Sequence, residues 1–300
     1  MEAREKTIVE ECIQKWNNGL PLDERLTYFC DNFETWMEQI PLECRPLVLT
    51  LIQNLQYYSH RATNKWLLEL HRQLLEQPNI SDENTIYAFI KSKYGKTNSS
   101  NDYWTEYKYI NGINRNICIE NMDSLDDEDW QHIKNIVFID DFSGSGKSFI
   151  DELKKNLARY KGKNVYFVVI NVMHKAVEKI GDYGKETDIN IIVLSAFQQE
   201  KAFERGLFED DAVAKTRIIK MSKDLQIPKD ERLGYKKTQA LVAFYNNTPN
   251  NTLGFIRYDT DKYKSIFPRQ DDYVPKWMQM KKSRQQRKQT NYNIATMKGN

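Results

Sequence analysis

The stretch Ile136-Val-Phe-Ile-Asp-Asp-Phe-Ser-Gly-Ser-Gly-Lys-Ser148 decides the fold of this chain of 300 residues. Its first four residues form a continuous apolar run, which is typical of a strand covered on both faces of a parallel sheet. Two acids, Asp140 and Asp141, end this run, and a turn of small residues follows. From Phe149 to Tyr160 the apolar residues recur at helical spacing. The sequence therefore predicts a strand, a loop whose backbone a ligand can approach closely, and a helix.

Free backbone amides at the start of a helix favour an anion, so a phosphate is the natural occupant of this loop. A P-loop nucleotide site needs glycine at the position of Asp141, where a carboxylate would repel a polyphosphate. Alternatively, Asp140 and Asp141 accept hydrogen bonds from two ribose hydroxyls, and the loop binds the phosphate of the same ribose. A third interpretation is an acid-rich turn with a Gly-Ser linker. The candidate phosphate-binding residues are Ser143, Gly144, Ser145, Gly146, Lys147 and Ser148.

The stretch resembles the signature of type I phosphoribosyltransferases, in which four apolar residues, two acids and three variable positions precede Thr-Gly-x-Thr. Asp140, Asp141, Ser145, Gly146 and Ser148 fall on the fixed positions without a gap, and serine replaces both threonines. The resemblance implies an α/β fold with a parallel-sheet, Rossmann-like core and a site for phosphoribosyl pyrophosphate or a nucleotide. It also implies Mg²⁺ bridging the ribose hydroxyls and the pyrophosphate, with Asp140 and Asp141 as catalytic and metal-binding acids.

A basic, hydroxylated segment follows the strand that we predict at residues 85–90. In phosphoribosyltransferases a loop after the first core strand holds the pyrophosphate, and residues 91–100 stand in that place. A solvated surface loop has the same composition, so that interpretation stays open. The candidate pyrophosphate-binding residues are Lys91, Lys93, Lys96, Ser99 and Ser100.

Two more predicted strands, residues 165–170 and 189–194, alternate with helical segments, which favours ligands at the carboxyl ends of a parallel sheet. Residues 195–199 lie at such an end, and the polar residues 246–253 follow a last apolar strand at 238–245. Their amides and hydroxyls suit a base or a ribose, although an ordinary Asn-Pro turn has the same composition. The candidate base or acceptor residues are Phe197, Asn246, Asn247, Thr248, Asn250 and Asn251.

Apolar stripes predict three helices before residue 78, of which the third and longest covers about residues 46–74. We therefore divide the chain into a helical bundle (1–78), a phosphoribosyltransferase-like domain (79–270) and a basic tail (271–300). The net charge of the chain is only +2, but residues 273–300 contain seven basic residues and no acid. Such a tail suits RNA, DNA or an acidic partner protein, or is simply solvated.

The similarity extends beyond the signature. Together with residues 245–253 and Phe267-Pro-Arg269, the signature resembles phosphoribosyltransferase-like effectors of bacterial conflict systems, which are associated with antiphage defence and some retron-type gene neighbourhoods. This resemblance covers residues 80–270 and implies a partner protein from the defence system. The chain departs from it at Gly254-Phe-Ile-Arg257, where we expect Pro-Ile-Leu-Trp or a similar segment in relatives.

The composition, 40% hydrophobic and 29% charged residues, is typical of a globular protein. No apolar segment approaches the length of a membrane span, and the amino terminus lacks the apolar stretch of a secretory signal. We therefore expect a cytoplasmic protein without membrane contact. The four cysteines, Cys12, Cys30, Cys44 and Cys118, do not have the spacing of a zinc site or a disulfide framework.

The sequence favours an enzyme that transfers or hydrolyses at ribose C1, because a carboxylate can stabilise the positive charge that develops on the sugar. A catalytically silent sensor is an alternative, in which the same pocket binds a nucleotide or phosphoribosyl compound and switches the helical region or the tail. A phosphate-loop NTPase is a further alternative. It would depend on Lys147, which occupies a variable position of the ribose-binding signature.

Overall fold

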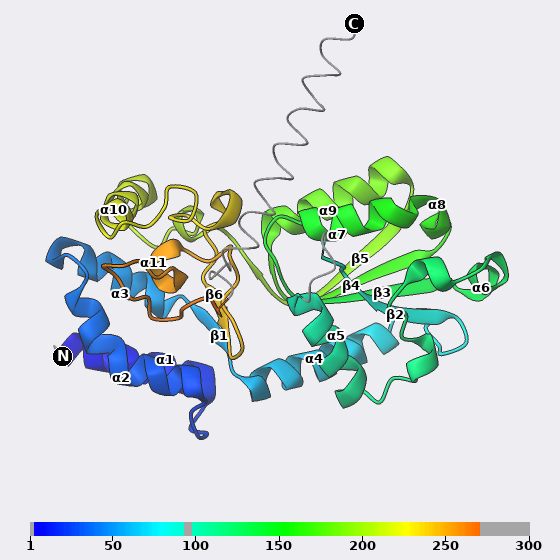
Figure 1. Ribbon diagram of the computed structural model, residues 1–300, viewed down its shortest axis with the longest axis horizontal. Helices are drawn as coiled ribbons and strands as arrows, with labels where there is room; N and C mark the ends of the chain where they lie inside the picture. Colours follow the sequence, from blue (N-terminus) through cyan, green and yellow to red (C-terminus); the bar gives the residue numbers. More distant parts are fainter. Residues whose placement is uncertain (1–2, 93–97, 271–300) are drawn as a thin grey trace, which may run out of the picture. The chain divides into compact units, whose positions relative to one another are not determined.

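The computed structural model describes residues 3–92 and 98–270 (Figure 1). Met1 to Pro268 forms one compact unit. The predicted basic tail, residues 271–300, lies outside the described residues. Within the described ranges, no helix is both long enough and apolar enough to cross a membrane.

Four parallel strands form the main sheet in the order β2-β3-β4-β5. Their bounds are Thr85–Phe89, Asn135–Ser143, Asn164–Met173 and Asn190–Gln199. All four apolar runs that predict strands of this sheet are strands, and the prediction of a parallel α/β core is confirmed. β3 is buried throughout and continues past its apolar run, because its pairing with β4 extends to Ser143 and Val172. Both acids therefore lie within the strand.

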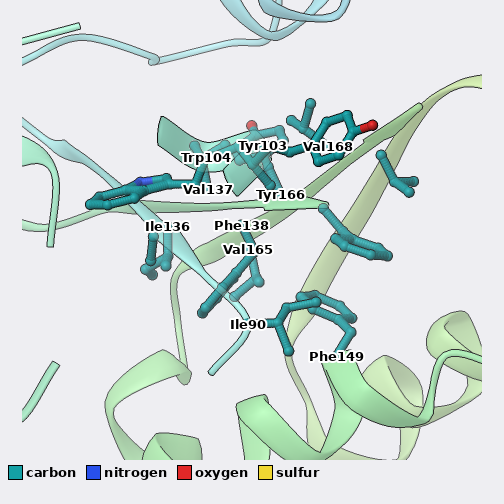
Figure 2. Packing of buried hydrophobic residues seen from close by; sticks show 14 of the residues in the cluster. Ile90, Tyr103, Trp104, Ile136, Val137, Phe138, Phe149, Val165, Tyr166 and Val168 are labelled. Atoms are coloured by element: carbon teal, nitrogen blue, oxygen red, sulfur yellow. The ribbon is translucent and has the colours of Figure 1, made fainter. Parts of the chain in front are cut away.

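Helices cover both faces of the main sheet (Figure 1). The helices α4 (His60–Leu75) and α5 (Ser99–Ile110) pack on one face, and α7 (Lys147–Leu153) and α9 (His174–Thr187) lie over the other. In Figure 2, Tyr103 and Trp104 of α5 lie on the opposite side of the strands from Phe149. The Phe149 ring stacks on Phe167 of β4 at 4.2 Å. The short helices α6 (Asp127–His132) and α8 (Leu157–Tyr160) also belong to the region of the main sheet.

A second hydrophobic core joins the two ends of the compact unit. It is formed by α1 (Ala3–Asn17), α2 (Glu24–Glu38), α3 (Arg45–Gln53), α10 (Asp211–Asp224) and α11 (Gly254–Arg257). The ring of Phe29 stacks on Phe267 at 5.3 Å, and the indole nitrogen of Trp36 donates to the Tyr263 hydroxyl at 2.6 Å. Residues more than 200 positions apart in the sequence therefore share one core.

A two-stranded parallel sheet lies between the two cores. It pairs β1 (Gln56–Tyr58) with β6 (Val242–Phe244). In β1, Tyr57 belongs to the second core and Tyr58 to the core of the main sheet. In β6, Val242 and Phe244 face the main-sheet core, whereas Ala243 belongs to the second core. This is the alternation expected of a strand with both faces buried.

Two predictions about elements are wrong. The predicted helix at residues 46–74 is interrupted by β1, because Ser59 begins a new helix by accepting a hydrogen bond from the Ala62 amide at 3.2 Å. The strand predicted at residues 238–245 is a strand only in β6, and it pairs with β1 instead of the main sheet. The predicted division after residue 78 falls inside the compact unit and stays a prediction.

Candidate functional site

A cavity of about 710 Å³ opens where β2 and β3 end. The end of β3, the loop from Gly144 to Gly146 and the start of α7 form its largest wall. Ile90 and Lys91, which follow β2, form a second wall. Residues distant in sequence complete the lining, namely Tyr235, Asn250 and Asn251. The predicted phosphate loop therefore lines a real cavity at the carboxyl ends of parallel strands, as we expect for an α/β fold.

Two glycines allow the loop to pack tightly. A Cβ at Gly144 would lie 2.1 Å from Nδ2 of Asn251, and that amide is held in place by a hydrogen bond to Thr238 Oγ1 at 2.8 Å. Gly146 has a φ of +67°, which a side chain would strain, and a Cβ there would lie 3.0 Å from Cγ1 of Ile180. Glycine is therefore required at both positions by the packing and the backbone conformation.

The two acids point to different surroundings. Asp140 lines the cavity, whereas Asp141 lies near Tyr103 of α5. The backbone amide of Asp141 donates to Oδ1 of Asp140 at 3.0 Å. Burial, and secondly the charge of Asp141, raise the pKa of Asp140 well above its ordinary value. Of the two predicted ribose-binding acids, Asp140 is the one that the structure places on the wall of the cavity.

Charged side chains of α7 and the residues after it form the base of the cavity. Lys147, a predicted phosphate ligand, is bound to Asp151 with distances of 2.6 and 2.9 Å from its Nζ. The buried Glu152 accepts hydrogen bonds from the Lys91 amide at 3.0 Å and from Lys155 Nζ at 2.6 Å. Asp151, Glu152 and Lys155 also line the cavity but were not predicted from the sequence as residues of the site. The helical spacing of Lys147 and Asp151 was a signal that the two side chains lie on one face.

The three described residues of the predicted pyrophosphate-binding set, Lys91, Ser99 and Ser100, have different surroundings in the structure. Lys91 donates from Nζ to Asn121 Oδ1 at 2.9 Å, and Ser99 is exposed at the start of α5. The Ser100 hydroxyl is buried, donates to the Ile139 carbonyl at 2.5 Å and accepts from the Ile90 amide at 2.9 Å. Ser100 therefore connects the ends of β2 and β3. Lys93 and Lys96 lie outside the described residues.

The predicted base or acceptor residues fall into four places. Asn250 and Asn251 line the cavity. Asn246 accepts from the Tyr103 hydroxyl at 3.1 Å. Thr248 donates to the Phe267 carbonyl at 2.9 Å and accepts from Arg25 at 2.7 Å, while its amide donates to Asn247 Oδ1 at 2.8 Å. Phe197 lines a different cavity, on the side of α4. The structure therefore places only Asn250 and Asn251 beside the phosphate loop.

Magnesium would find few ligands from the protein alone. Within residues 3–92 and 98–270 there is no group of three or more His, Cys, Asp or Glu side chains suited to a metal ion. Mg²⁺ commonly uses one or two carboxylates and completes its shell with water and substrate phosphate. The Asp140 carboxyl group on the cavity wall fits that mode of binding, in which the substrate supplies the other oxygen atoms.

A parallel sheet with an acid and a glycine-rich phosphate loop at the end of an internal strand is the arrangement of a phosphoribosyltransferase-like protein. The chain belongs to the PRTase-CE family, whose model matches residues 32–269. No curated protein matches the sequence.

Two phosphoribosyltransferases are among the solved structures that are similar to the chain. The orotate phosphoribosyltransferase from Aeropyrum pernix is 14% identical, with a TM-score of 0.30 over 46% of this chain and 70% of that chain. The Helicobacter pylori xanthine-guanine-hypoxanthine phosphoribosyltransferase is also 14% identical, with a TM-score of 0.30 over 49% of this chain and 84% of that chain. Likenesses this weak carry no argument about the substrate.

Proposed function

We propose that the protein binds phosphoribosyl pyrophosphate or a nucleotide and cleaves the bond at ribose C1, by transfer to an acceptor or by hydrolysis. One observation carries this proposal: Asp140 and the loop from Ser143 to Ser148 line the same cavity. A ribose 5′-phosphate has a phosphoryl group at one end and two hydroxyls at the other. It would therefore satisfy the loop and the acid together.

The chemistry assigned to Asp140 is electrostatic. Cleavage at C1 develops positive charge on the ribose ring, and an adjacent carboxylate stabilises that charge more than it stabilises the ground state. Burial raises the pKa of Asp140, which shifts this group toward its neutral form. Positive charge on the ribose, or a magnesium ion that arrives with the substrate, would favour the carboxylate. Lys155 lines the same cavity and would have to exchange its partner Glu152 for the departing pyrophosphate in order to neutralise it.

Binding of phosphoribosyl pyrophosphate by isothermal titration calorimetry, with and without magnesium, tests the proposal. We expect Asp140→Asn to abolish turnover and to weaken binding about tenfold or more, which corresponds to roughly 1.4 kcal/mol. We expect Lys147→Ala to weaken binding less, because Lys147 is paired with Asp151. Asp182→Asn, an exposed acid on α9, is the matched control and should bind like the unaltered protein.

A phosphate-loop NTPase predicts the reverse order. ATP hydrolysis that Lys147→Ala abolishes and Asp140→Asn spares would overturn the ribose-binding proposal. The same set of variants therefore separates the two chemistries without any assumption about the acceptor.

A catalytically silent sensor is the second candidate, and the contacts of Lys91 favour it. The Lys91 ammonium group donates to Asn121 at 2.9 Å, so it would have to leave that partner in order to neutralise a leaving group in the cavity. Incubation with radiolabelled phosphoribosyl pyrophosphate, magnesium and a panel of bases and nucleotides separates the candidates. Labelled product supports the enzyme, whereas tight binding without consumption supports the sensor.

We also propose that the protein acts as an effector in antiphage defence in the bacterial cytoplasm, with a partner protein from the same defence system. The resemblance of residues 80–270 to conflict-system effectors supports this role. A bacterial strain that expresses the full defence locus should resist phage, and Asp140→Asn should remove the resistance while Asp182→Asn preserves it. Equal resistance with both variants would contradict the proposal.

A further inference from the structure

A second cavity, of about 1410 Å³, lies between α1, β1 and the first turns of α4, and it reaches the end of β5. It shares no lining residue with the cavity of the proposed active site. Pockets for small molecules usually measure about 300–1,000 Å³, so this groove is larger than a single small ligand requires. Its size suits an extended ligand with several repeating units.

Aromatic rings form the floor of this groove where α4 meets β5. Trp66 and Phe197 meet edge to face, with ring centroids 5.4 Å apart and an interplanar angle of 82°. Tyr58 contacts Phe197 in the same manner at 6.1 Å. Although it lies in a strand, Phe197 is 37% exposed. An exposed ring beside a second ring in a cavity presents a stacking surface for planar groups.

Basic side chains lie next to these aromatic rings. The groove is lined by Lys15, Arg61, Lys65 and Arg72 against one acid, Glu69. Arg72 is paired with Glu69, and Lys15 donates to the carbonyls of Gln53 and Leu55 at 3.2 and 3.1 Å. Arg61 and Lys65 are exposed, and the Lys65 Nζ lies 5.7 Å from the centroid of the Trp66 ring. The positive charge available to a ligand is therefore adjacent to the stacking surface.

We propose that this groove binds single-stranded nucleic acid. Bases stack on Trp66 and Phe197, and the phosphates lie near Arg61 and Lys65. Rings and cations side by side are the combination that single strands need, because every base has a π face and every linkage has a negative charge. An acidic peptide would use the cations but leave the rings without a specific role. The proposal does not depend on the reaction at the first cavity.

Fluorescence anisotropy with labelled 12-residue oligouridine and oligothymidine tests the proposal on the full chain. We expect Trp66→Ala and Phe197→Ala each to weaken binding about tenfold, as is typical when one stacked base is lost. Arg61→Gln should reduce the slope of log affinity against log salt by about one. Tyr109→Ala, which removes an exposed aromatic ring from α5, is the matched control and should bind normally. The oligonucleotide that binds more tightly shows whether RNA or DNA is the preferred ligand.

The basic tail requires its own control, because its charge alone could bind nucleic acid. In the full chain, Lys281, Lys282, Arg284, Arg287 and Lys288 are replaced together by glutamine. Residual binding that still depends on Trp66 supports the groove. The proposal is overturned if binding disappears with the tail charges or if polyglutamate competes for it equally well. It is also overturned if the affinity stays within twofold in Trp66→Ala, Phe197→Ala and Arg61→Gln. Absence of binding at 50 mM salt overturns it as well. The exposed Arg61 keeps the test valid even if an aromatic variant folds poorly.

Discussion

The buried Asp140, for which we propose a role in binding, carries a cost in stability. Its pKa is raised by burial and by the charge of Asp141, so the folded protein holds this proton more tightly than the unfolded chain does. The contribution of Asp140 to stability is therefore most favourable at low pH, and it decreases as the pH rises above the ordinary aspartate pKa of about 4. At neutral pH an uncharged residue at this position should suit the fold better.

Replacement of Asp140 should separate these two effects. We expect Asp140→Asn to raise the free energy of unfolding by about 1 kcal/mol at neutral pH while ligand binding weakens about tenfold or more, because stability and function are often opposed at functional sites. The gain should disappear below about pH 3, where the aspartate is protonated in both states. Urea unfolding at several pH values measures this difference. A variant less stable than the unaltered protein at pH 7 would show that the carboxylate stabilises the fold.

Ser100 illustrates a residue whose type suggests ligand binding but whose contacts are structural. We expect Ser100→Ala to lower the free energy of unfolding by about 1–3 kcal/mol, because it leaves the Ile90 amide and the Ile139 carbonyl without this partner. Ser99→Ala, at an exposed position next to it, should stay within about 0.5 kcal/mol. Thermal denaturation compares the two. Equal stability with weaker ligand binding would restore the predicted pyrophosphate role.

Sequence reasoning at the scale of single residues succeeded where the local pattern alone carries the chemistry. The order of acids and glycines identified Asp140 and the loop that share a cavity. It could not identify Glu152, because a glutamate in a helix is usually solvated and its burial depends on Lys91 and Lys155. The sequence also could not show that Asn251 lines the cavity whereas Thr248 does not. The partners of Thr248 are Arg25 and Phe267, which are distant in sequence.

The loop between β3 and α7 depends on close contact with a segment about one hundred residues later. We expect Gly144→Ala to destabilise the protein by about 1–3 kcal/mol, because the new methyl group would collide with the Asn251 amide. Binding of a phosphoribosyl ligand should weaken as well. Gly181→Ala in α9 should instead stabilise by about 0.5–1 kcal/mol, because a methyl group there meets no atom within 4 Å. Differential scanning calorimetry measures both changes, and a neutral Gly144→Ala would contradict the tight packing.

The strands of the main sheet were predictable because each is a continuous apolar run bounded by polar residues. β1 was not, because Tyr57 and Tyr58 fit the apolar spacing of a helix as well as a strand. What makes this segment a strand is its pairing with β6, almost 190 residues away. Such pairing leaves no local signal in a sequence, whereas the cap at Ser59 was a visible sign of a helix start.

At the scale of the molecule, the two cores make the amino-terminal helices part of the fold. We expect a chain of residues 79–300 to lack a cooperative unfolding transition, because it loses Leu67, Leu70 and Leu74 from the main-sheet core and half of the second core. A chain of residues 1–268 should unfold in one transition, since it is one compact unit. Urea titration followed by tryptophan fluorescence tests both. A cooperative transition in residues 79–300 would support the domain boundary predicted from the sequence.

The arrangement of the whole molecule was only partly predictable. The sequence predicted helices followed by a parallel sheet, because the spacing of apolar residues indicates each helix or strand separately. The second core was not, because the partners of Phe29 and Trp36 come from the last part of the compact unit. An apolar stripe shows that a helix packs against another part of the chain, but it does not show which segment that is.

The pairing of β1 with β6 has a consequence for synthesis on the ribosome. Residues 56–58 emerge early, yet their partner at 242–244 is translated almost 190 codons later. Until then the rings of Trp16, Phe29 and Trp36 lack the chain that covers them, and a nascent polypeptide with such exposed surface is a substrate for chaperones. The polypeptide thus completes its amino-terminal half only when its translation is nearly finished.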